Sequence, residues 1–317
     1  MRYSAVTMNV EDCLPEELRG ATITRIAAGL SGAGVYRVES GGQTLVLKVA
    51  SEREPDADWR PALVIQRLAA GAGLAPRIVH TDEARRAVLS AFVTDRSFVS
   101  IYRDPRTSQA ALALLGRTVR RIHALPIPAE AHRRDGREFL GQLSGGLQGF
   151  SLPDFARAAI ERVLAENPPA SERALVLSHN DLNPSNLVYD GDAILLLDWA
   201  AAGANDPFYD LATLAVFLRM EEGTCLRVLA AYDGNSALAL PERLRYFRRL
   251  VAALAGTASL HLARHLQHPG GTGADTRDST LPLGDFYQRM MSGALKLGTP
   301  EGQWAFGLSL IKESLAL

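Results

Sequence analysis

The chain has 317 residues, 47% of them hydrophobic, with 34 Lys and Arg balanced by 35 Asp and Glu. A chain of this size can bury a core in more than one lobe. Its net charge of −1 creates no overall field that favours nucleic acid or an anionic membrane, so we expect neither as a partner. Two cysteines, acidic residues among the first twenty positions and the lack of a long apolar run argue against a disulfide scaffold, a signal peptide and a membrane span. We therefore expect a cytoplasmic protein.

The first ninety residues predict a lobe rich in strands. Apolar and β-branched runs predict strands over 22–28, 35–38, 43–50, 77–80 and 87–93, with a helix over about 58–72. The first two strands are joined by the turn Gly29-Leu-Ser31-Gly32-Ala-Gly34. Such a turn lets backbone N–H groups approach phosphates without side-chain obstruction, although most Gly-rich hairpins are only turns.

Lys48 lies among apolar residues in the strand over 43–50. A positive charge in such a position needs an anionic partner. The chain contains three lysines against thirty-one arginines, and the two side chains are not interchangeable at a phosphate site. We therefore interpret Lys48 as a phosphate-binding residue; the alternative is a surface lysine at a strand edge.

The rest of the chain predicts mainly helices. Apolar residues at helical spacing begin near residue 107, and a further helix is predicted over 155–164. The stretch 126–152 is rich in Pro, Gly and Arg and predicts a loop. Helices are predicted over about 210–220, 223–232, 241–267 and 283–316, and the polar, Gly-rich segment 268–280 predicts a linker.

The segment His179-Asn-Asp181-Leu-Asn-Pro-Ser-Asn186 carries the clearest chemistry, and Asp198 follows at the end of an apolar run. The spacing from Asp181 to Asn186 matches the catalytic loop of kinases, where the Asp takes the proton of the substrate hydroxyl and the Asn binds magnesium. Asp198 lies where a second magnesium ligand is needed. We expect His179 to brace the loop by hydrogen bonds to the backbone. The alternative is a polar turn between two strands.

These motifs together resemble the aminoglycoside phosphotransferase and choline/thiamine kinase superfamily. The helix motif from Leu115 to Pro126 is also similar to that family, and the resemblance covers about residues 20–220. It implies an α+β, two-lobed protein-kinase-like fold, with a nucleotide-binding lobe over 1–93 and a helical lobe over 94–317. It implies ATP as phosphoryl donor, with Mg²⁺ bound by Asn186 and Asp198. It further implies that the nucleotide is bound by Gly29, Ser31, Gly32, Gly34, Lys48, Ser90 and Phe92.

Two departures from the family pattern stand out. The first helix contains no Glu to pair with Lys48, so Asp58 or Glu54 would have to replace it, or the phosphates alone would hold the lysine. Three alanines, Ala200 to Ala202, stand where choline kinases tend to be acidic and aromatic, which weakens choline as the specific substrate.

The substrate is predicted only in class. Asp206 and Asp210 are interpreted as a turn residue and a first-turn helix residue, or as groups that face a cation. Trp199 and Tyr209, with Phe208 and Trp304, are interpreted as core aromatics or as part of a cage for an amine. We take Trp199, Asp206 and Tyr209 as candidate substrate residues. The acidity near Asp206 and Asp210 favours an amine-bearing alcohol such as choline, ethanolamine, thiamine or an aminoglycoside.

The predicted function is therefore ATP-dependent phosphorylation of a hydroxyl on a small molecule. The alternatives are a kinase for a sugar or a hydroxy amino acid, and a non-catalytic nucleotide-binding regulatory module. A protein kinase is disfavoured because the seven residues between Asp198 and Asp206 are too few for a peptide-docking activation segment. The composition sets no oligomeric state.

Overall fold

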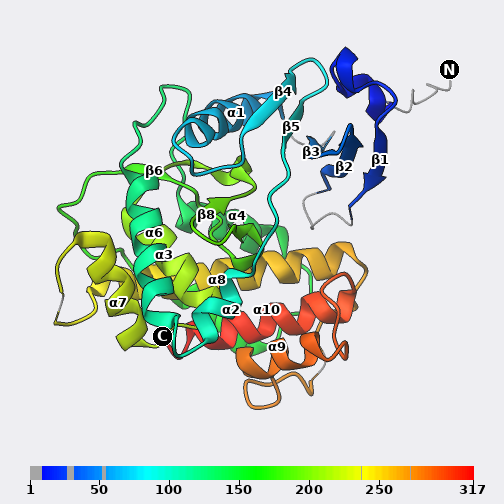
Figure 1. Cartoon of the computed structure of the whole chain (residues 1–317). Helices are drawn as coiled ribbons and strands as arrows, with labels where there is room; N and C mark the ends of the chain where they lie inside the picture. The colour runs from blue at the N-terminus through cyan, green and yellow to red at the C-terminus, as the bar shows by residue number, and fades with distance from the viewer. Residues whose placement is uncertain (1–8, 27–31, 52–54, 237, 272) are drawn as a thin grey trace.

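A five-stranded sheet and a larger helical body form the molecule (Figure 1). The computed structural model describes residues 9–26, 32–51, 55–236, 238–271 and 273–317. The sheet and helix α1 lie at one end of the molecule, and helices α8, α9 and α10 lie at the other. This arrangement confirms the predicted mixed α+β fold.

The sheet is antiparallel throughout, with the strand order β1-β2-β3-β5-β4. Its strands are β1 Thr22–Arg25, β2 Gly34–Ser40, β3 Gln43–Val49, β4 Ile78–Asp82 and β5 Ala87–Ala91. Alternate residues Leu45, Leu47 and Val49 of β3 are buried, as expected for a strand with one face in the core. Helix α1, Asp56–Gly71, covers the sheet through Trp59 and Leu63.

The turn before β2 is only partly described. Gly29 and Ser31 lie outside the described residues. Gly32 has φ +73°, a left-handed conformation that favours glycine. A Cβ on Gly34 would lie 2.8 Å from the ring of Tyr36, so a side chain here would require that ring to shift.

Helices dominate the chain after β5. The helices are α2 Phe98–Arg103, α3 Ser108–His123, α4 Gly136–Gly146, α5 Asp154–Ala165, α6 Pro207–Phe217, α7 Glu222–Asp233, α8 Glu242–His265, α9 Leu283–Met291 and α10 Pro300–Ser314. Helices α8 and α10 pack closely, because a Cβ on Gly256 would lie 2.8 Å from the carbonyl oxygen of Gly307. None of the described helices is both long and apolar enough to cross a lipid bilayer.

Two sequence predictions in this region were wrong. The stretch 126–152 contains α4, whose N-terminus is capped by Asp135 accepting from the backbone N–H groups of Arg137 and Glu138. Four glycines within 136–146 hid this helix, because glycine has a low helix propensity and the helix depends on tertiary packing. The predicted helix over 283–316 is divided into α9 and α10, and Thr299 caps the start of the second.

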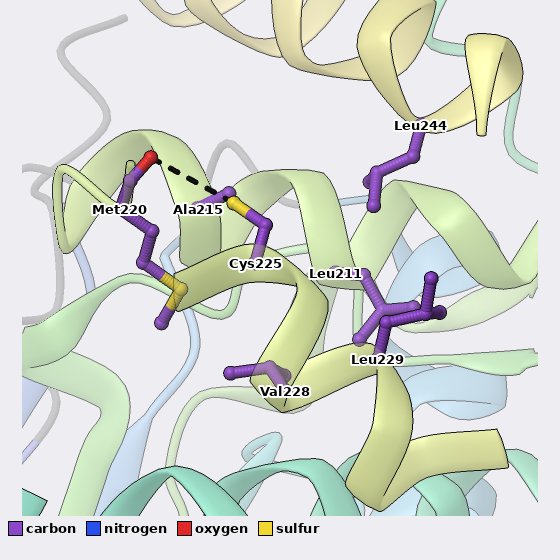
Figure 2. A pocket seen from close by; sticks show the side chains of 7 residues that line it. All are labelled: Leu211, Ala215, Met220, Cys225, Val228, Leu229 and Leu244. Carbon is purple, nitrogen blue, oxygen red and sulfur yellow. Dashed lines mark hydrogen bonds between the residues drawn. The ribbon is translucent and has the colours of Figure 1, made fainter. Parts of the chain in front are cut away.

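A small cavity lies between α6, α7 and α8 (Figure 2). It encloses about 10 Å³ and is lined by apolar side chains, among them Leu211, Val228 and Leu244. The thiol of Cys225 donates to the carbonyl of Met220 beside it, at 3.7 Å. A space that could hold at most one water, with an apolar lining, is a gap in packing rather than a ligand site.

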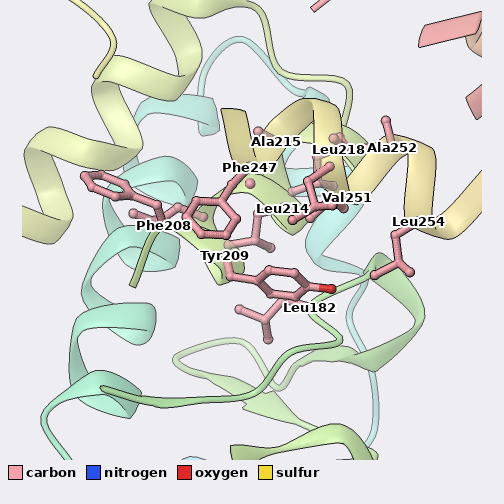
Figure 3. Close-up of a cluster of buried hydrophobic side chains, with 14 of the residues drawn as sticks. Leu182, Phe208, Tyr209, Leu214, Ala215, Leu218, Phe247, Val251, Ala252 and Leu254 are labelled. Atoms are coloured by element: carbon pink, nitrogen blue, oxygen red, sulfur yellow. The ribbon is translucent and has the colours of Figure 1, made fainter. Parts of the chain in front are cut away.

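The main core joins α6 and α8 to the segment that carries Asp181. Figure 3 shows Tyr209 and Leu214 of α6 close to Phe247 and Val251 of α8, with Leu182 beside the ring of Tyr209. The rings of Tyr209 and Phe247 meet edge to face with centroids 6.0 Å apart. The residue after Asp181 is therefore anchored in the largest apolar cluster of the molecule.

Candidate active site

Two short ribbons hold the segment from His179 to Asp198. In the first, β6 Val176–Ser178 pairs with β9 Gly203–Asn205; in the second, β7 Leu187–Tyr189 pairs with β8 Ile194–Leu196. Between them lie two single 3-10 turns, η3 Pro184–Asn186 and η4 Trp199–Ala201. The polar segments thus begin and end at residues of paired strands, and these strands hold them in a rigid frame.

Amide side chains hold Asp181 on both sides. The amide nitrogen of Asn183 donates to Oδ1 of Asp181 at 2.8 Å. The amide nitrogen of Asn186 donates to Oδ2 of Asp181 at 2.8 Å and to its backbone oxygen at 2.9 Å. The amide oxygen of Asn186 therefore points away from Asp181, because its nitrogen faces the carboxylate.

Asp198 converges on the same place. The backbone N–H of Leu197 donates to the carbonyl of Asn186 at 2.9 Å, so Asp198 lies one residue from that contact. Asp198 has φ 56° and ψ 75°, a left-handed conformation that is strained for a residue other than glycine. Such a conformation persists only where the surrounding structure enforces it.

Lys48 reaches this site from the sheet. Its Nζ lies 2.7 Å from Oδ1 of Asp198, and both side chains are about one-third exposed. The suggestion that Asp58 pairs with Lys48 was wrong, because Asp58 lies instead beside His132 and Arg134. Glu54 lies outside the described residues. The strand lysine therefore pairs with the carboxylate after β8 and spans the boundary between sheet and loop.

The two carboxylates have opposite pKa shifts. Burial raises the pKa of Asp181, the two amide hydrogen bonds oppose this rise, and the charge of Asp198 adds to it. Burial alone would also raise the pKa of Asp198, but the charge and hydrogen bond of Lys48 outweigh it and the pKa is lowered. Because the charge of Asp198 acts on Asp181, the two carboxylates lie within electrostatic reach.

His179 is fully buried and bonded to the backbone at both ring nitrogens. Nε2 donates to the carbonyl of Leu197 at 2.9 Å, and Nδ1 accepts from the N–H of Asp181 at 3.3 Å. Its ring meets Trp199 edge to face, with centroids 4.6 Å apart. Burial lowers the pKa of His179, which favours the neutral ring that this donor and acceptor pattern requires.

Asp210 holds the start of the loop that carries Asp181. It is fully buried and accepts hydrogen bonds from the N–H groups of His179 at 2.9 Å and Asn180 at 2.8 Å. His123 of α3 adds a third contact at 3.1 Å, and its other ring nitrogen lies 2.8 Å from the hydroxyl of Tyr232. Burial alone would raise the pKa of Asp210, but the hydrogen bond and charge of His123 and the partners at His179 lower it.

The candidate substrate residues have different surroundings. The indole N–H of Trp199, which is 2% exposed, donates to the carbonyl of Leu196 at 3.0 Å. The carboxylate of Asp206 accepts from the N–H of Phe208 at 2.9 Å and from Nε of Arg243 at 2.6 Å. The polar groups of Trp199 and Asp206 are therefore already hydrogen-bonded to other groups of the protein.

Tyr209 differs from Trp199 and Asp206. Its ring is packed in the core, but its hydroxyl forms no hydrogen bond with the described part of the chain. Burial, followed by the charges of Asp210 and Asp181, raises its pKa. The phenol is therefore neutral at physiological pH, within electrostatic reach of Asp181, and able to donate a hydrogen bond.

The remaining predicted nucleotide residues lie at the end of β5. The hydroxyl of Ser90 is 3.5 Å from the carbonyl of Val46. Phe92 is 39% exposed, and the guanidinium of Arg37 lies 5.3 Å from its ring centroid. An exposed aromatic at the junction between sheet and helices is available to a planar ring.

Sequence inspection missed four residues that hold the loop. Asn183 orients Asp181, His123 supports Asp210, Asn205 donates to the amide oxygen of Asn180 at 2.7 Å, and Arg243 neutralises Asp206. The only local signal was Asn183, which lies two residues after Asp181. The others come from elements 25 to 87 residues away and meet their partners only in the folded chain.

The donor set at this site suits magnesium. Mg²⁺ prefers oxygen ligands and takes one or two from protein when phosphates supply others. The carboxylate of Asp198 and the amide oxygen of Asn186, which its own hydrogen bonds turn away from Asp181, provide such a pair. Among the described residues no group of three or more His, Cys, Asp or Glu could hold a metal, so a zinc-type centre has no support there.

Comparisons with known proteins agree with this geometry. The family model described as "Phosphotransferase enzyme family" matches residues 22–247. Protein LicA of Haemophilus influenzae is 44% identical over 36 residues, which cover 11% of this chain and 14% of LicA. The match thus spans about one-seventh of that relative.

Two solved structures share the fold. A choline/ethanolamine kinase family protein from Mesorhizobium loti is 18% identical, with 92% of each chain covered and a TM-score of 0.60. An aminoglycoside-3'-phosphotransferase of type VIII is 26% identical, with 74% of this chain and 94% of that chain covered and a TM-score of 0.53. Because the family model covers more than half of the chain, the chain belongs to the phosphotransferase enzyme family.

Proposed function

We propose that this phosphotransferase moves the terminal phosphoryl group of ATP to a hydroxyl of a small, amine-bearing alcohol, with Mg²⁺ bound by Asn186 and Asp198. The observation that carries the proposal is the convergence of Asp181, Asn186, Asp198 and Lys48: Asn186 contacts Asp181, Lys48 contacts Asp198, and the backbone of Leu197, next to Asp198, donates to Asn186. Residues 1–93 bind the nucleotide in this proposal, and residues 94–317 supply the catalytic loop and the acceptor pocket.

Asp181 is the acceptor-side residue. An ionised carboxylate held by two amides orients the attacking hydroxyl and takes its proton late in the transfer. Lys48 places a positive charge beside the donor phosphates. Bound Mg²⁺ would neutralise charge on the phosphates, which is the main requirement of phosphoryl transfer.

The nucleotide lies against the sheet in this proposal. Gly32 and Gly34 bind the phosphates through backbone N–H groups in this proposal, together with Gly29 and Ser31, which lie outside the described residues. The left-handed conformation of Gly32 supports that role. The end of β5, with Ser90 and the exposed Phe92, faces the adenine.

Tyr209 is the acceptor contact that the geometry supports best. Its hydroxyl has no partner among the described residues and is within electrostatic reach of Asp181. Replacing Tyr209 by Phe should raise the KM for the acceptor and leave the KM for ATP unchanged. An unchanged acceptor KM would remove Tyr209 from the pocket.

The amine on the acceptor is supported by similarity rather than by a charge in the site. The type VIII aminoglycoside-3'-phosphotransferase, at 26% identity, is named for an amine-bearing substrate. Asp206 is neutralised by Arg243, and Asp210 is fully bonded within the core. Since neither carboxylate is left for a cation, a neutral sugar is the second candidate.

An ADP-release assay over amino-alcohols, aminoglycosides, sugars and hydroxy amino acids tests the proposal. The wild-type chain should phosphorylate at least one amine-bearing alcohol, with the product identified by mass. Asp181→Asn should lower kcat about a thousandfold and leave ATP affinity nearly unchanged, because it removes the base and keeps the shape. Turnover at the wild-type rate in Asp181→Asn would reject the assigned role.

The same assay separates the alternatives. Product only from neutral sugars would replace the amine-bearing alcohol with the second candidate, and product only from hydroxy amino acids would identify the acceptor as an amino acid. ATP binding without product from any acceptor would favour the non-catalytic nucleotide-binding module.

A further inference from the structure

Helix α1 carries a proline inside its second turn. A helix over about 58–72, as predicted from the sequence, would place Pro61 in its first turn, but α1 starts at Asp56. In an α-helix the N–H of residue 61 would donate to the carbonyl of Ala57, and proline has no N–H. The carbonyl of Ala57 is therefore left without its helical donor.

A side chain from outside the helix fills this vacancy in the hydrogen-bond ladder. Nε2 of His132 lies 2.9 Å from the carbonyl oxygen of Ala57. His132 comes from the segment between α3 and α4, more than seventy residues away. A backbone carbonyl that has lost its helical partner needs another donor, and His132 supplies it.

We call residues 131–134 the strap. The strap lies along β9: the N–H of Ala204 donates to the carbonyl of His132, and the N–H of Arg134 donates to the carbonyl of Ala204, both at 2.9 Å. Arg133 and Ala204 form a parallel bridge. A Cβ on Gly203 would lie 2.4 Å from the carbonyl oxygen of His132, so the glycine permits this close approach.

The strap also contacts the turn that follows Asp198. Nη2 of Arg134 lies 3.4 Å from the carbonyl of Ala200 in η4. The carboxylate of Asp58 lies 3.9 Å from the ring of His132 and 4.0 Å from the guanidinium of Arg134. The side chains of Asp58, His132 and Arg134 are about one-third to one-half exposed, so these ion-pair contacts contribute little by themselves. The hydrogen bond to Ala57 and the backbone pairing with β9 form the main link.

The strap therefore joins helix α1, strand β9 and the turn η4, which are the three elements around Asp198. Helix α1 packs against η4, which begins directly after Asp198. Asp198 is in a left-handed conformation that its surroundings must enforce. Helix α1 offers no glutamate to Lys48, and Lys48 contacts Asp198 directly.

We propose that His132 is a positioning residue: its bond to the carbonyl freed by Pro61 holds α1 on η4 and so fixes Asp198 for magnesium. This inference rests on the proposed function, in which Asp198 binds Mg²⁺. It assigns to the strap the placement of the first helix, which a lysine–glutamate pair would otherwise provide.

The test measures ATP binding by calorimetry on the full chain, once with Mg²⁺ and once with EDTA. The wild-type chain should bind ATP more tightly with Mg²⁺. His132→Ala should reduce this gain about tenfold, as loss of residues that orient metal ligands does, and leave the affinity in EDTA unchanged. His132→Gln should restore the gain, because its amide can donate to the same carbonyl.

Pro61→Ala tests the origin of the bond. It returns an N–H to α1, so Ala57 no longer depends on His132. On the Pro61→Ala background, His132→Ala should therefore change the magnesium gain by much less than it does in the wild-type chain. Equal effects on both backgrounds would reject the role of Pro61.

Arg133→Ala is the matched control, since its side chain is exposed and forms no hydrogen bond or ion pair with the described residues. It should bind as the wild-type chain does. A wild-type magnesium gain in His132→Ala would overturn the proposal for the strap while the proposed function stands. The absence of any magnesium gain in the wild-type chain would instead overturn the proposed function.

Discussion

The acceptor side and the nucleotide side of the site are supported in different ways. On the acceptor side, the fully buried Asp210 fixes the backbone of His179 and Asn180, and amides fix Asp181. On the nucleotide side, one ion pair between Lys48 and Asp198, about one-third exposed, connects sheet and loop. The loop that carries Asp181 is thus set by the core, whereas the position of Lys48 depends on how sheet and helices lie against each other.

Replacing Asp210 by Asn should have the largest effect, because it attacks the buried support. Asn has one acceptor oxygen in place of two, and its amide would face a backbone N–H. We expect a loss of stability of about 3 kcal/mol and a large fall in kcat. Denaturant unfolding and turnover should be measured on the same preparation. Wild-type values for both would mean that the loop does not depend on Asp210.

Replacing Lys48 by Ala should affect catalysis and leave the fold intact. We expect kcat/KM for ATP to fall about a hundredfold, because a fixed positive charge at the phosphates is lost. The free energy of unfolding should change by less than about 1 kcal/mol, since the ion pair is partly exposed. Lys296→Ala provides a lysine control in the helical body. Large destabilisation by Lys48→Ala would show that the two sides are not supported differently.

Replacing Asn183 by Ala should have the smallest effect, visible in the pH profile. Burial already raises the pKa of Asp181, and the hydrogen bond from Asn183 lowers it. Without that bond the pKa rises further, so the base becomes protonated at a higher pH. The acid limb of kcat/KM should therefore move towards higher pH, with the rate at high pH little changed. A shift towards lower pH would contradict the assignment of Asp181 as the group that must be ionised.

The sequence predicted the parts of this site that depend on short spacing. Asp181, Asn186 and Asp198 lie within eighteen residues and between apolar runs, so their convergence follows from two tight ribbons. The sheet was predictable because its strands either alternate apolar and polar residues or are rich in β-branched residues. The strand lysine was recognised because its charge lies in an apolar run.

The contacts that cross the chain could not be predicted in the same way. Lys48 and Asp198 are separated by 150 residues, and His132 and Ala57 by 75. In neither pair does the local sequence around one residue indicate which distant residue it contacts. The acidity at Asp206 and Asp210 suggested a cationic substrate, but Arg243 and buried backbone donors, invisible to a local pattern, take up both charges.

The amide nitrogen of Asn186 donates two hydrogen bonds, one to the backbone carbonyl and one to the carboxylate of Asp181. This pair of hydrogen bonds has a consequence for the product of the reaction. In the proposed function Asn186 ligates the metal and Asp181 takes the proton, so these two residues cannot shift independently. An acceptor with several hydroxyls must then present one of them at a single spot. We expect regioselective phosphorylation, with one positional isomer dominating the product even when the acceptor is a polyol.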